Sequence, residues 1–115
     1  MSKRLCGITI TCDSHVILLL CVYFPTDPGT QTFDETNLDV VLSDIRGMCE
    51  SVCPDSVIIG GDINCDFNRN SGFVNKVRHF TVQNDLCIVW DKFPVDFTYI
   101  HTDKDSSSTI DHFCV

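Results

Sequence analysis

The sequence predicts a single domain of the mixed α/β class (α+β in some classifications). Segments in which apolar residues alternate or run continuously, as in strands, are interleaved with two segments in which they recur every three or four positions, as in helices. The chain has 115 residues, enough to bury a core, and its hydrophobic fraction of 43% is that of an ordinary globular protein. No internal repeat, low-complexity segment or linker divides it, so residues 1–115 are expected to form one domain.

The first two elements are predicted to be strands joined by a tight turn. Apolar and polar residues alternate over Leu5–Cys12 as in a half-buried strand, and Asp13 and Ser14 follow as a two-residue turn. Val16–Phe24 is almost continuously apolar, which is typical of a central strand covered on both faces. Pro25 ends this strand.

Two helices are predicted, one on each side of a short strand. Thr32 and Glu35 have the spacing of a capping box, and apolar residues then recur at helical spacing as far as Pro54. The second helix is expected to begin after Ser71. The residues that the helices would bury are Leu38, Val41, Leu42, Ile45, Met48 and Val52 in the first, and Phe73, Val74, Val77 and Phe80 in the second.

The remaining segments are predicted to be short strands. Val57–Ile59 is typical of a buried strand between the helices, and Leu86–Trp90, Phe97–Ile100 and Thr109–Val115 follow the second helix. The polar segment Thr102–Ser108 is expected to be a hairpin loop. The predicted order is therefore β-β-α-β-α-β-β-β, which indicates a mixed sheet in a layered protein.

The charge of the chain argues against a nucleic-acid ligand. Lys and Arg total 8 against 16 Asp and Glu, so the net charge is −8, and no basic run occurs. Proteins that bind nucleic acids usually present a basic surface, because neutralising phosphates supplies much of their affinity. If the partner is a nucleic acid, the basic surface must lie elsewhere.

The eight cysteines are expected to be small buried hydrophobes in a reducing compartment, because several lie within apolar runs. No pair has the C-x-x-C spacing of a zinc site. The N-terminus lacks a signal-peptide pattern, and the longest apolar run, Val16–Phe24, is too short to span a bilayer. We therefore expect an intracellular protein, in the nucleus or the cytoplasm, with no transmembrane segment and no membrane partner.

The motif Gly60-Gly61-Asp62-Ile63-Asn64 is the first candidate for a functional site. The two glycines are expected to turn the backbone tightly, because glycine adopts conformations that other residues avoid. Asp62 and Asn64 would then project from the carboxyl end of a strand, where open α/β sheets usually place their functional groups. A carboxylate and an amide suit Mg²⁺ and phosphate rather than zinc. Alone, the motif is equally consistent with a structural turn.

Further polar residues stand at the ends of other apolar strands, and their order along the chain is informative. The set is Tyr23 before Pro25, Asp62 and Asn64, Thr98 in Phe97-Thr-Tyr99, and Ser108 and Asp111 in Ser108-Thr-Ile-Asp-His112. This ordered set resembles the endonuclease/exonuclease/phosphatase superfamily, which includes abasic-site endonucleases, retroelement endonucleases, sphingomyelinases and inositol-polyphosphate phosphatases. The spacing from Asn84 to His112 is similar to that in the endonuclease domain of non-LTR (LINE-type) retrotransposons, and the resemblance covers essentially the whole chain.

The resemblance implies a four-layer αββα sandwich, with two facing mixed sheets and outer helices, and metal-dependent hydrolysis of a phosphate ester. It implies that Asp62 acts as the general base, that Asn64 hydrogen-bonds the scissile phosphate, and that the hydroxyl of Tyr23 steadies the phosphate. Asp111 matches a carboxylate that orients a catalytic histidine, and Ser108 and Thr98 match supporting hydrogen-bonding residues. The implied cofactor is Mg²⁺ or Mn²⁺, with Asp62 as a candidate ligand of an incomplete site. We expect Asp62, Asn64, Tyr23 and Asp111 to converge on one cleft.

The chain also departs from the superfamily pattern. No Gln-Glu motif precedes Leu5, and the terminal Ser-Asp-His motif, which should follow Val115, is absent, so the metal-binding glutamate and the catalytic histidine are absent. His112 matches the neighbour of the orienting acid, not the catalytic histidine. We therefore expect the central part of a domain truncated at both ends, with little nuclease activity and poor solubility when isolated. The complete protein would bind and nick DNA and carry a reverse-transcriptase domain in the same polyprotein.

Other interpretations stay open. The substrate of the same superfamily site could be a small phosphate ester or a lipid head group, as in a phosphatase or lipid phosphodiesterase, which the acidic charge favours. The chain could instead be a non-catalytic remnant or a binding module. Among single residues, Tyr23 alone is typical of a core tyrosine at a strand end, and Asp66 and Asn68 are typical of loops. His15, His79 and His101 are assigned no role.

Overall fold

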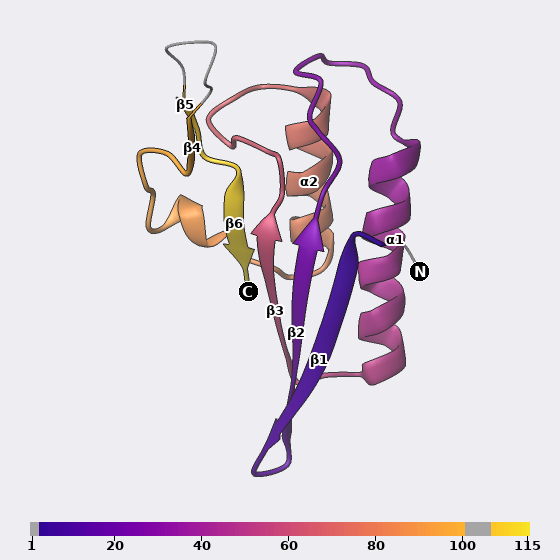
Figure 1. Cartoon of the computed structure of the whole chain (residues 1–115). Coiled ribbons are helices and arrows are strands. Elements are labelled where there is room, and N and C mark those ends of the chain that lie inside the picture. The colour runs from indigo at the N-terminus through magenta and orange to yellow at the C-terminus, as the bar shows by residue number, and fades with distance from the viewer. Residues whose placement is uncertain (1–2, 101–106) are drawn as a thin grey trace.

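The computed structural model describes residues 3–100 and 107–115, and its centre is a four-stranded sheet (Figure 1). The strands are β1 (Leu5–Cys12), β2 (His15–Tyr23), β3 (Ser56–Asp62) and β6 (Asp111–Cys114), in the order β1-β2-β3-β6. β2 and β3 run parallel, whereas β1 and β6 are antiparallel to their neighbours. β2 and β3 therefore end at the same edge of the sheet, where β6 begins.

The predicted hairpin at the start of the chain is confirmed. β1 pairs with β2 along its whole length, from Leu5 opposite Val22 to Cys12 opposite His15. Asp13 and Ser14 form the two-residue turn with φ values of 49° and 70°. Positive φ at both central residues is the geometry whose twist matches that of the flanking strands.

Two helices, α1 (Thr36–Val52) and α2 (Gly72–Gln83), cover one face of this sheet (Figure 1). The core lies between them and the alternating strand residues that point toward them, such as Leu18 and Leu20, each 1% exposed. The predicted apolar stripes are confirmed for the residues buried from the helices, which are Leu38, Val41, Leu42 and Ile45 from α1 and Phe73, Val74, Val77 and Phe80 from α2. No helix in the described ranges is long and apolar enough to cross a membrane.

The predicted capping box at Thr32 is wrong, because α1 begins four residues later. Glu35 already has helical dihedral angles and makes no capping hydrogen bond; its carboxylate instead accepts a 2.6 Å bond from Lys76 of α2. Asp34 takes the capping role, since its Oδ1 accepts hydrogen bonds from the backbone N–H and the hydroxyl of Thr36, at 3.0 and 2.7 Å. The predicted start of α2 is confirmed: Ser71 is its N-cap and accepts from the N–H of Val74.

The predicted tight turn at Gly60 and Gly61 is also wrong, because both glycines lie within β3. Gly60 pairs with Phe113 and Gly61 with His112 of β6, so the strand continues to Asp62. Gly61 has φ 135°, and a Cβ there would lie 2.2 Å from the carbonyl oxygen of Val22. The glycines thus allow close strand packing, and the chain turns at Asn64, whose φ is 52°.

The segment Leu86–Trp90 does not form the predicted strand. It makes one antiparallel bridge, Ile88 to Cys114, and then a short 3₁₀-helix, η1 (Val89–Asp91). The strands predicted at Phe97–Ile100 and Thr109–Val115 are shorter than expected and form β4 (Tyr99–Ile100) and β6. Ser107 and Ser108, which were predicted to lie in a loop, form β5 (Ser107–Ser108) and pair with β4 as a separate two-stranded sheet. Most of the predicted loop Thr102–Ser108 lies outside the described residues, as does His101.

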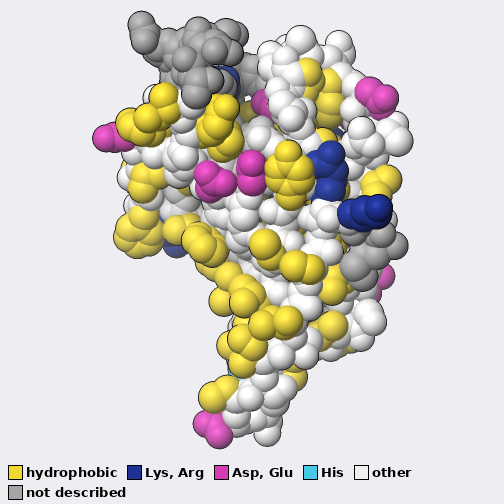
Figure 2. All heavy atoms as spheres, in the orientation of Figure 1, with side chains coloured by type: hydrophobic (Ala, Val, Ile, Leu, Met, Phe, Trp, Pro, Cys, Tyr) yellow, Lys and Arg dark blue, Asp and Glu magenta, His cyan; other side chains and the backbone are white. Residues whose placement is uncertain are grey.

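The second face of the main sheet is open, although the apolar run of β2 predicted cover on both sides. Cys21 and Tyr23 of β2 are exposed, as are Ile8 (60%) and Phe113 (58%) on the flanking strands. Hydrophobic side chains run down this face in Figure 2. Within the described ranges the helices cover one face of the main sheet, and the small β4–β5 sheet lies beyond the start of β6 and not over the open face (Figure 1).

Candidate functional site

Three of the four predicted catalytic residues form a row across the open face of the sheet. Tyr23 of β2 is the register partner of Asp62 of β3, and Asp62 is the register partner of Asp111 of β6. Register partners on neighbouring strands present their side chains on the same face, so the three side chains lie side by side. In Figure 2 acidic side chains lie near basic ones toward the upper end of this face, above the hydrophobic run.

Asn64, the fourth residue, is joined to this row through Asp62. The backbone N–H of Asn64 donates a 2.9 Å hydrogen bond to Oδ1 of Asp62, and its side-chain Nδ2 donates at 2.8 Å to the carbonyl of Phe24. The left-handed conformation of Asn64 makes this loop possible, and asparagine adopts that conformation more readily than most residues. The loop therefore orients the Asp62 carboxylate and links the ends of β2 and β3.

The surroundings of Asp62 raise the pKa of its carboxyl above the ordinary value. Partial burial raises the pKa of this carboxyl, and the neighbouring charge of Asp111 raises it further. The N–H of Asn64 and the ring of His112 act in the opposite direction, but the net shift of the pKa is upward. Two carboxylates side by side, with one half-buried, suit proton transfer and cation binding better than anion binding.

A cation lies beside the other end of the row. The guanidinium carbon of Arg4 is 5.0 Å from the centre of the Tyr23 ring, and its Nη1 donates to the carbonyl of Tyr23 at 3.4 Å. Arg4 is not among the predicted site residues, because a single arginine before a strand has no distinctive sequence signal. Its position here follows from the pairing of β1 with β2.

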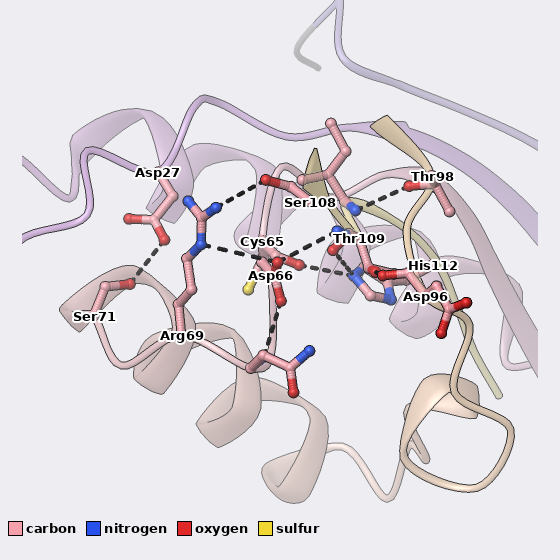
Figure 3. A network of polar contacts seen from close by, with 12 residues as sticks. Asp27, Cys65, Asp66, Arg69, Ser71, Asp96, Thr98, Ser108, Thr109 and His112 are labelled. Atoms are coloured by element: carbon pink, nitrogen blue, oxygen red, sulfur yellow. Dashed lines mark hydrogen bonds and ion pairs between the residues drawn. The ribbon is translucent and has the colours of Figure 1, made fainter. Parts of the chain in front are cut away.

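The two predicted supporting residues lie in different places. Thr98 accepts hydrogen bonds at Oγ1 from the backbone N–H groups of Ile110 and Asp111, at 3.1 and 3.2 Å, so it holds the start of β6. Ser108 is 4% exposed and accepts a 3.0 Å bond from Nη2 of Arg69 (Figure 3). It lines a cavity of about 300 Å³ with Asn64 and Arg69, next to the row but not in it.

The loop between β3 and α2 is tied to the chain around it by a polar network that the sequence did not predict (Figure 3). Asp66 accepts from the N–H of Asn68 at 3.0 Å, as its predicted loop role requires, and also from the N–H of Thr109 at 3.3 Å. Ser71 donates to Asp27 at 2.8 Å, which joins the start of α2 to the loop after β2. The contacts of Asp66 with Thr109 and of Ser71 with Asp27 join residues 43 and 44 positions apart, so no local pattern could reveal them.

His112 lies on the helix side of β6 and outside the row. It is 4% exposed, and its Nε2 donates to the carbonyls of Cys65 and Thr109, at 2.7 and 2.9 Å. Its ring packs edge-on against Phe67, with centroids 4.6 Å apart. His15 lies at the opposite end of the sheet, where its Nε2 is 2.8 Å from Oγ of Ser56.

The carboxylate oxygen atoms of the row are of the type that binds a hard divalent cation. Mg²⁺ is commonly held by one or two carboxylates, with waters and substrate phosphate completing its shell, and Asp62 and Asp111 are such a pair. Across residues 3–100 and 107–115, no group of three or more His, Cys, Asp or Glu side chains forms a metal site. Within the described residues this carboxylate pair is therefore not a complete metal site.

Comparison with known proteins finds similar folds among solved structures. No protein-family model and no curated protein matches the sequence. Among solved structures, the endonuclease domain of TRAS1, a telomere-specific non-LTR retrotransposon, matches with a TM-score of 0.73 and 18% identity, over 96% of this chain and 49% of that one. The human Nocturnin catalytic domain matches with a TM-score of 0.59 and 12% identity, over 99% of this chain and 49% of its own.

A third match is an endonuclease/exonuclease/phosphatase family protein from Leptotrichia buccalis, with a TM-score of 0.58 and 18% identity, over 96% of this chain and 41% of that one. The chain thus has the fold seen in endonuclease/exonuclease/phosphatase structures, as the ordered strand-end residues predicted. It spans about half the length, or less, of the solved structures it matches.

Proposed function

We propose that this chain is part of a metal-dependent phosphodiesterase, and that the complete protein is a retroelement endonuclease that nicks DNA. The observation that carries the proposal is the row of Tyr23, Asp62 and Asp111, with Asn64 joined to Asp62, in a chain whose fold matches that of a retrotransposon endonuclease domain. The DNA substrate and a reverse-transcriptase domain in the same polyprotein belong to this proposal.

In the proposed reaction Asp62 orients the attacking water and accepts its proton. Its raised pKa brings the carboxyl closer to the range in which a general base is effective. Asn64 uses one N–H of its amide to bind Phe24, which leaves the second N–H to contact the phosphate. The exposed side chain of Tyr23 would steady the same phosphate through its hydroxyl. These groups act by positioning and by electrostatic stabilisation of an anionic transition state.

The remaining predicted residues have supporting roles in the proposal. Asp111 would orient a histidine supplied from outside the described residues, and Thr98 and Ser108 would hold the backbone around it. Asp62, with Asp111 beside it, would hold Mg²⁺ or Mn²⁺. When bound, this ion would act as a Lewis acid on the phosphate.

The open face of the sheet fits the four-layer sandwich that the fold implies. The row lies at one end of this face, and the apolar side chains below it, such as Ile8 and Phe113, are the kind that a second sheet buries. A second sheet packed there would border the row and add its own side chains to it. The site in these 115 residues would then be about half of the complete one.

A second candidate is a phosphatase or lipid phosphodiesterase with the same site. The net charge of −8 favours it, because an acidic protein is a poor electrostatic partner for DNA. A chain without activity on any phosphate ester would support the third interpretation, a non-catalytic remnant or binding module.

The test is a nicking assay on supercoiled plasmid with Mg²⁺. We expect little or no nicking by the isolated chain, and nicking by a protein extended in frame through the flanking reading frame. Asp62→Asn should abolish that nicking, whereas Asp85→Asn, the same chemical change at an exposed position after α2, should not. Hydrolysis of phospholipid or inositol phosphates without nicking would favour the second candidate. Nicking by the isolated chain that Asp62→Ala removes would show that the residues present suffice.

A further inference from the structure

The two carboxylates of the row lie at the end of a short strand pair. Asp62 and Asp111 form the last of the register pairs that join β3 to β6, so the chain leaves the sheet directly beyond them. The end of a strand pair opens more readily than its middle. The separation of the two carboxylates therefore depends on what holds the loop after β3 to the segment before β6.

The buried side chain of His112 contacts both of these segments at once. Its Nε2 donates to the carbonyl of Cys65, in the loop after β3, at 2.7 Å, and to the carbonyl of Thr109, just before β6, at 2.9 Å (Figure 3). Cys65 and Thr109 are 0% and 1% exposed, so their surroundings are closed to water and a carbonyl there needs a donor from the protein. One side chain thus bridges the two segments.

The ring of His112 is held in place from the side of the helices. It packs edge-on against Phe67, and the guanidinium carbon of Arg78 lies 4.8 Å from the centre of the Phe67 ring. Arg78 of α2 in turn makes two hydrogen bonds to the carboxylate of Asp91 in η1, at 3.0 and 3.1 Å. Contacts from two elements outside the sheet therefore keep the ring directed at the two carbonyls.

Only one nitrogen of this ring has a partner among the described residues. Both atoms that Nε2 meets are carbonyl oxygens, which can only accept, so Nε2 carries the proton. Nδ1 is buried and makes no hydrogen bond to the described residues. An unpartnered buried nitrogen costs free energy, and phenylalanine would fill a similar space without that cost. The contribution that histidine makes at this position is therefore its Nε2–H group.

We propose that His112 is a positioning residue of the candidate site, and that its Nε2–H holds the loop after Asp62 and the segment before Asp111 at a fixed separation. The inference rests on the proposed function and adds to it the side chain that sets the geometry of the carboxylate pair. His112 acts from the helix side of the sheet and touches neither carboxylate of the row. In the proposed reaction Asp62 accepts a proton and Asp111 orients a histidine, so a change in their separation would misalign both groups.

The nicking assay on the extended protein separates the donor of His112 from its ring. His112→Gln keeps an N–H donor at about the reach of Nε2 and loses the ring, whereas His112→Phe keeps a ring and loses the donor. We expect kcat to fall at least about tenfold in His112→Phe, with KM within about twofold, because misaligned groups slow the chemical step while contacts to DNA elsewhere persist. In His112→Gln kcat should stay within about threefold of the unaltered protein.

His15 provides the matched control, because its side-chain contact with Ser56 lies at the opposite end of the sheet. His15→Phe, the same chemical change, should leave kcat unaltered. The far-ultraviolet circular dichroism of each variant checks its fold, and His112→Leu provides a second variant without a donor should His112→Phe not fold. Equal losses of kcat in His112→Gln and His112→Phe, or a loss in His112→Gln alone, would overturn the inference.

Amide hydrogen exchange tests the bridge without any activity. Peptides that span residues 63–68 and 107–111 should exchange at least about threefold faster in His112→Phe than in the unaltered protein, and His112→Gln should restore the slower rate. Peptides from the β1–β2 hairpin should not change. Unaltered exchange in both segments of His112→Phe would overturn the inference. If the unaltered extended protein does not nick DNA but shows this exchange pattern, the bridge stands and the proposed function fails.

Discussion

Replacing Gly61 by alanine is expected to destabilise the protein strongly and to disturb the candidate site. The backbone of Gly61 has φ 135°, a conformation that residues with a Cβ rarely adopt. The added Cβ would lie 2.2 Å from the carbonyl oxygen of Val22 and 3.1 Å from its nitrogen. Both are backbone atoms of β2, so the clash cannot be relieved by a side-chain rotation. Only a shift of one strand against the other would relieve it.

The expected size of the effect follows from the strained backbone of Gly61 and from the clash of the added Cβ with Val22. A backbone held in such a region costs about 1–3 kcal/mol, and separating β3 from β2 would add to it. We therefore expect the free energy of unfolding to fall by at least about 2 kcal/mol. With a urea slope of about 1–3 kcal/mol per M, the midpoint should move down by roughly 1 M. Because Asp62 follows Gly61 directly, the same shift would displace its carboxylate from Tyr23 and Asp111.

The assay is urea unfolding followed by circular dichroism, with Gly47→Ala as the matched control. Gly47 lies inside α1, and a Cβ there meets nothing within 4 Å. Alanine at this exposed helix position should stabilise the protein by about 0.5–1 kcal/mol. The reasoning would be refuted if Gly61→Ala unfolded at the same urea concentration as the unaltered chain. It would also fail if the two alanine variants were equally destabilised.

Three further predictions concern caps, charge and thiols. Ser71→Ala should lower the free energy of unfolding by about 1 kcal/mol or more, because Ser71 caps α2 and donates to Asp27. Thr32→Ala should change it by less than about 0.5 kcal/mol. An equal loss in both variants would support the capping box at Thr32 instead. The stability of Asp62→Asn relative to the unaltered chain should increase as the pH rises. A carboxyl whose folded pKa is raised loses its stabilising contribution as the pH passes upward through that pKa, and asparagine does not titrate. A relative stability of Asp62→Asn that instead increased on acidification from neutral pH would contradict the raised pKa. The prediction that the eight cysteines are buried is wrong for most of them, because only Cys65 and Cys114 are buried and five are exposed. Burial raises the pKa of the Cys114 thiol to about 12 and raises that of Cys65 as well. Mass spectrometry after brief alkylation should therefore find both unmodified while the exposed Cys6 and Cys21 react, and equal modification of Cys65 and Cys6 would contradict the packing.

Local patterns were sufficient wherever a structure depends on neighbouring residues. The hairpin at Asp13 and Ser14, the buried stripes of both helices and the start of the second helix after Ser71 were all predicted, because turns, helical faces and helix starts involve residues a few positions apart. The polar residues at strand ends were also identified from their order along the chain. Their roles in catalysis remain predictions.

The predictions that failed involve competition from distant parts of the chain. Glu35 does not form a capping box, and it binds Lys76, 41 positions away on the other helix. Gly60 and Gly61 look like a turn in isolation, but pairing with β6 keeps them in a strand. The cover expected on both faces of β2 is present on one face of the described structure, because an apolar run shows that a strand avoids water without showing what packs on it.

The proximity of Tyr23, Asp62 and Asp111 likewise depends on pairing over long distances in the sequence. The parallel register of β2 with β3 brings Tyr23 to Asp62, and the antiparallel register of β3 with β6 brings Asp111 to the other side. Side chains alternate between the two faces of a strand, so a shift of one residue in either register would move a carboxylate to the opposite face. The order of polar residues along the chain, through the resemblance it carries, selects the residues of the candidate site. Strand register, a property of the folded sheet as a whole, places them together.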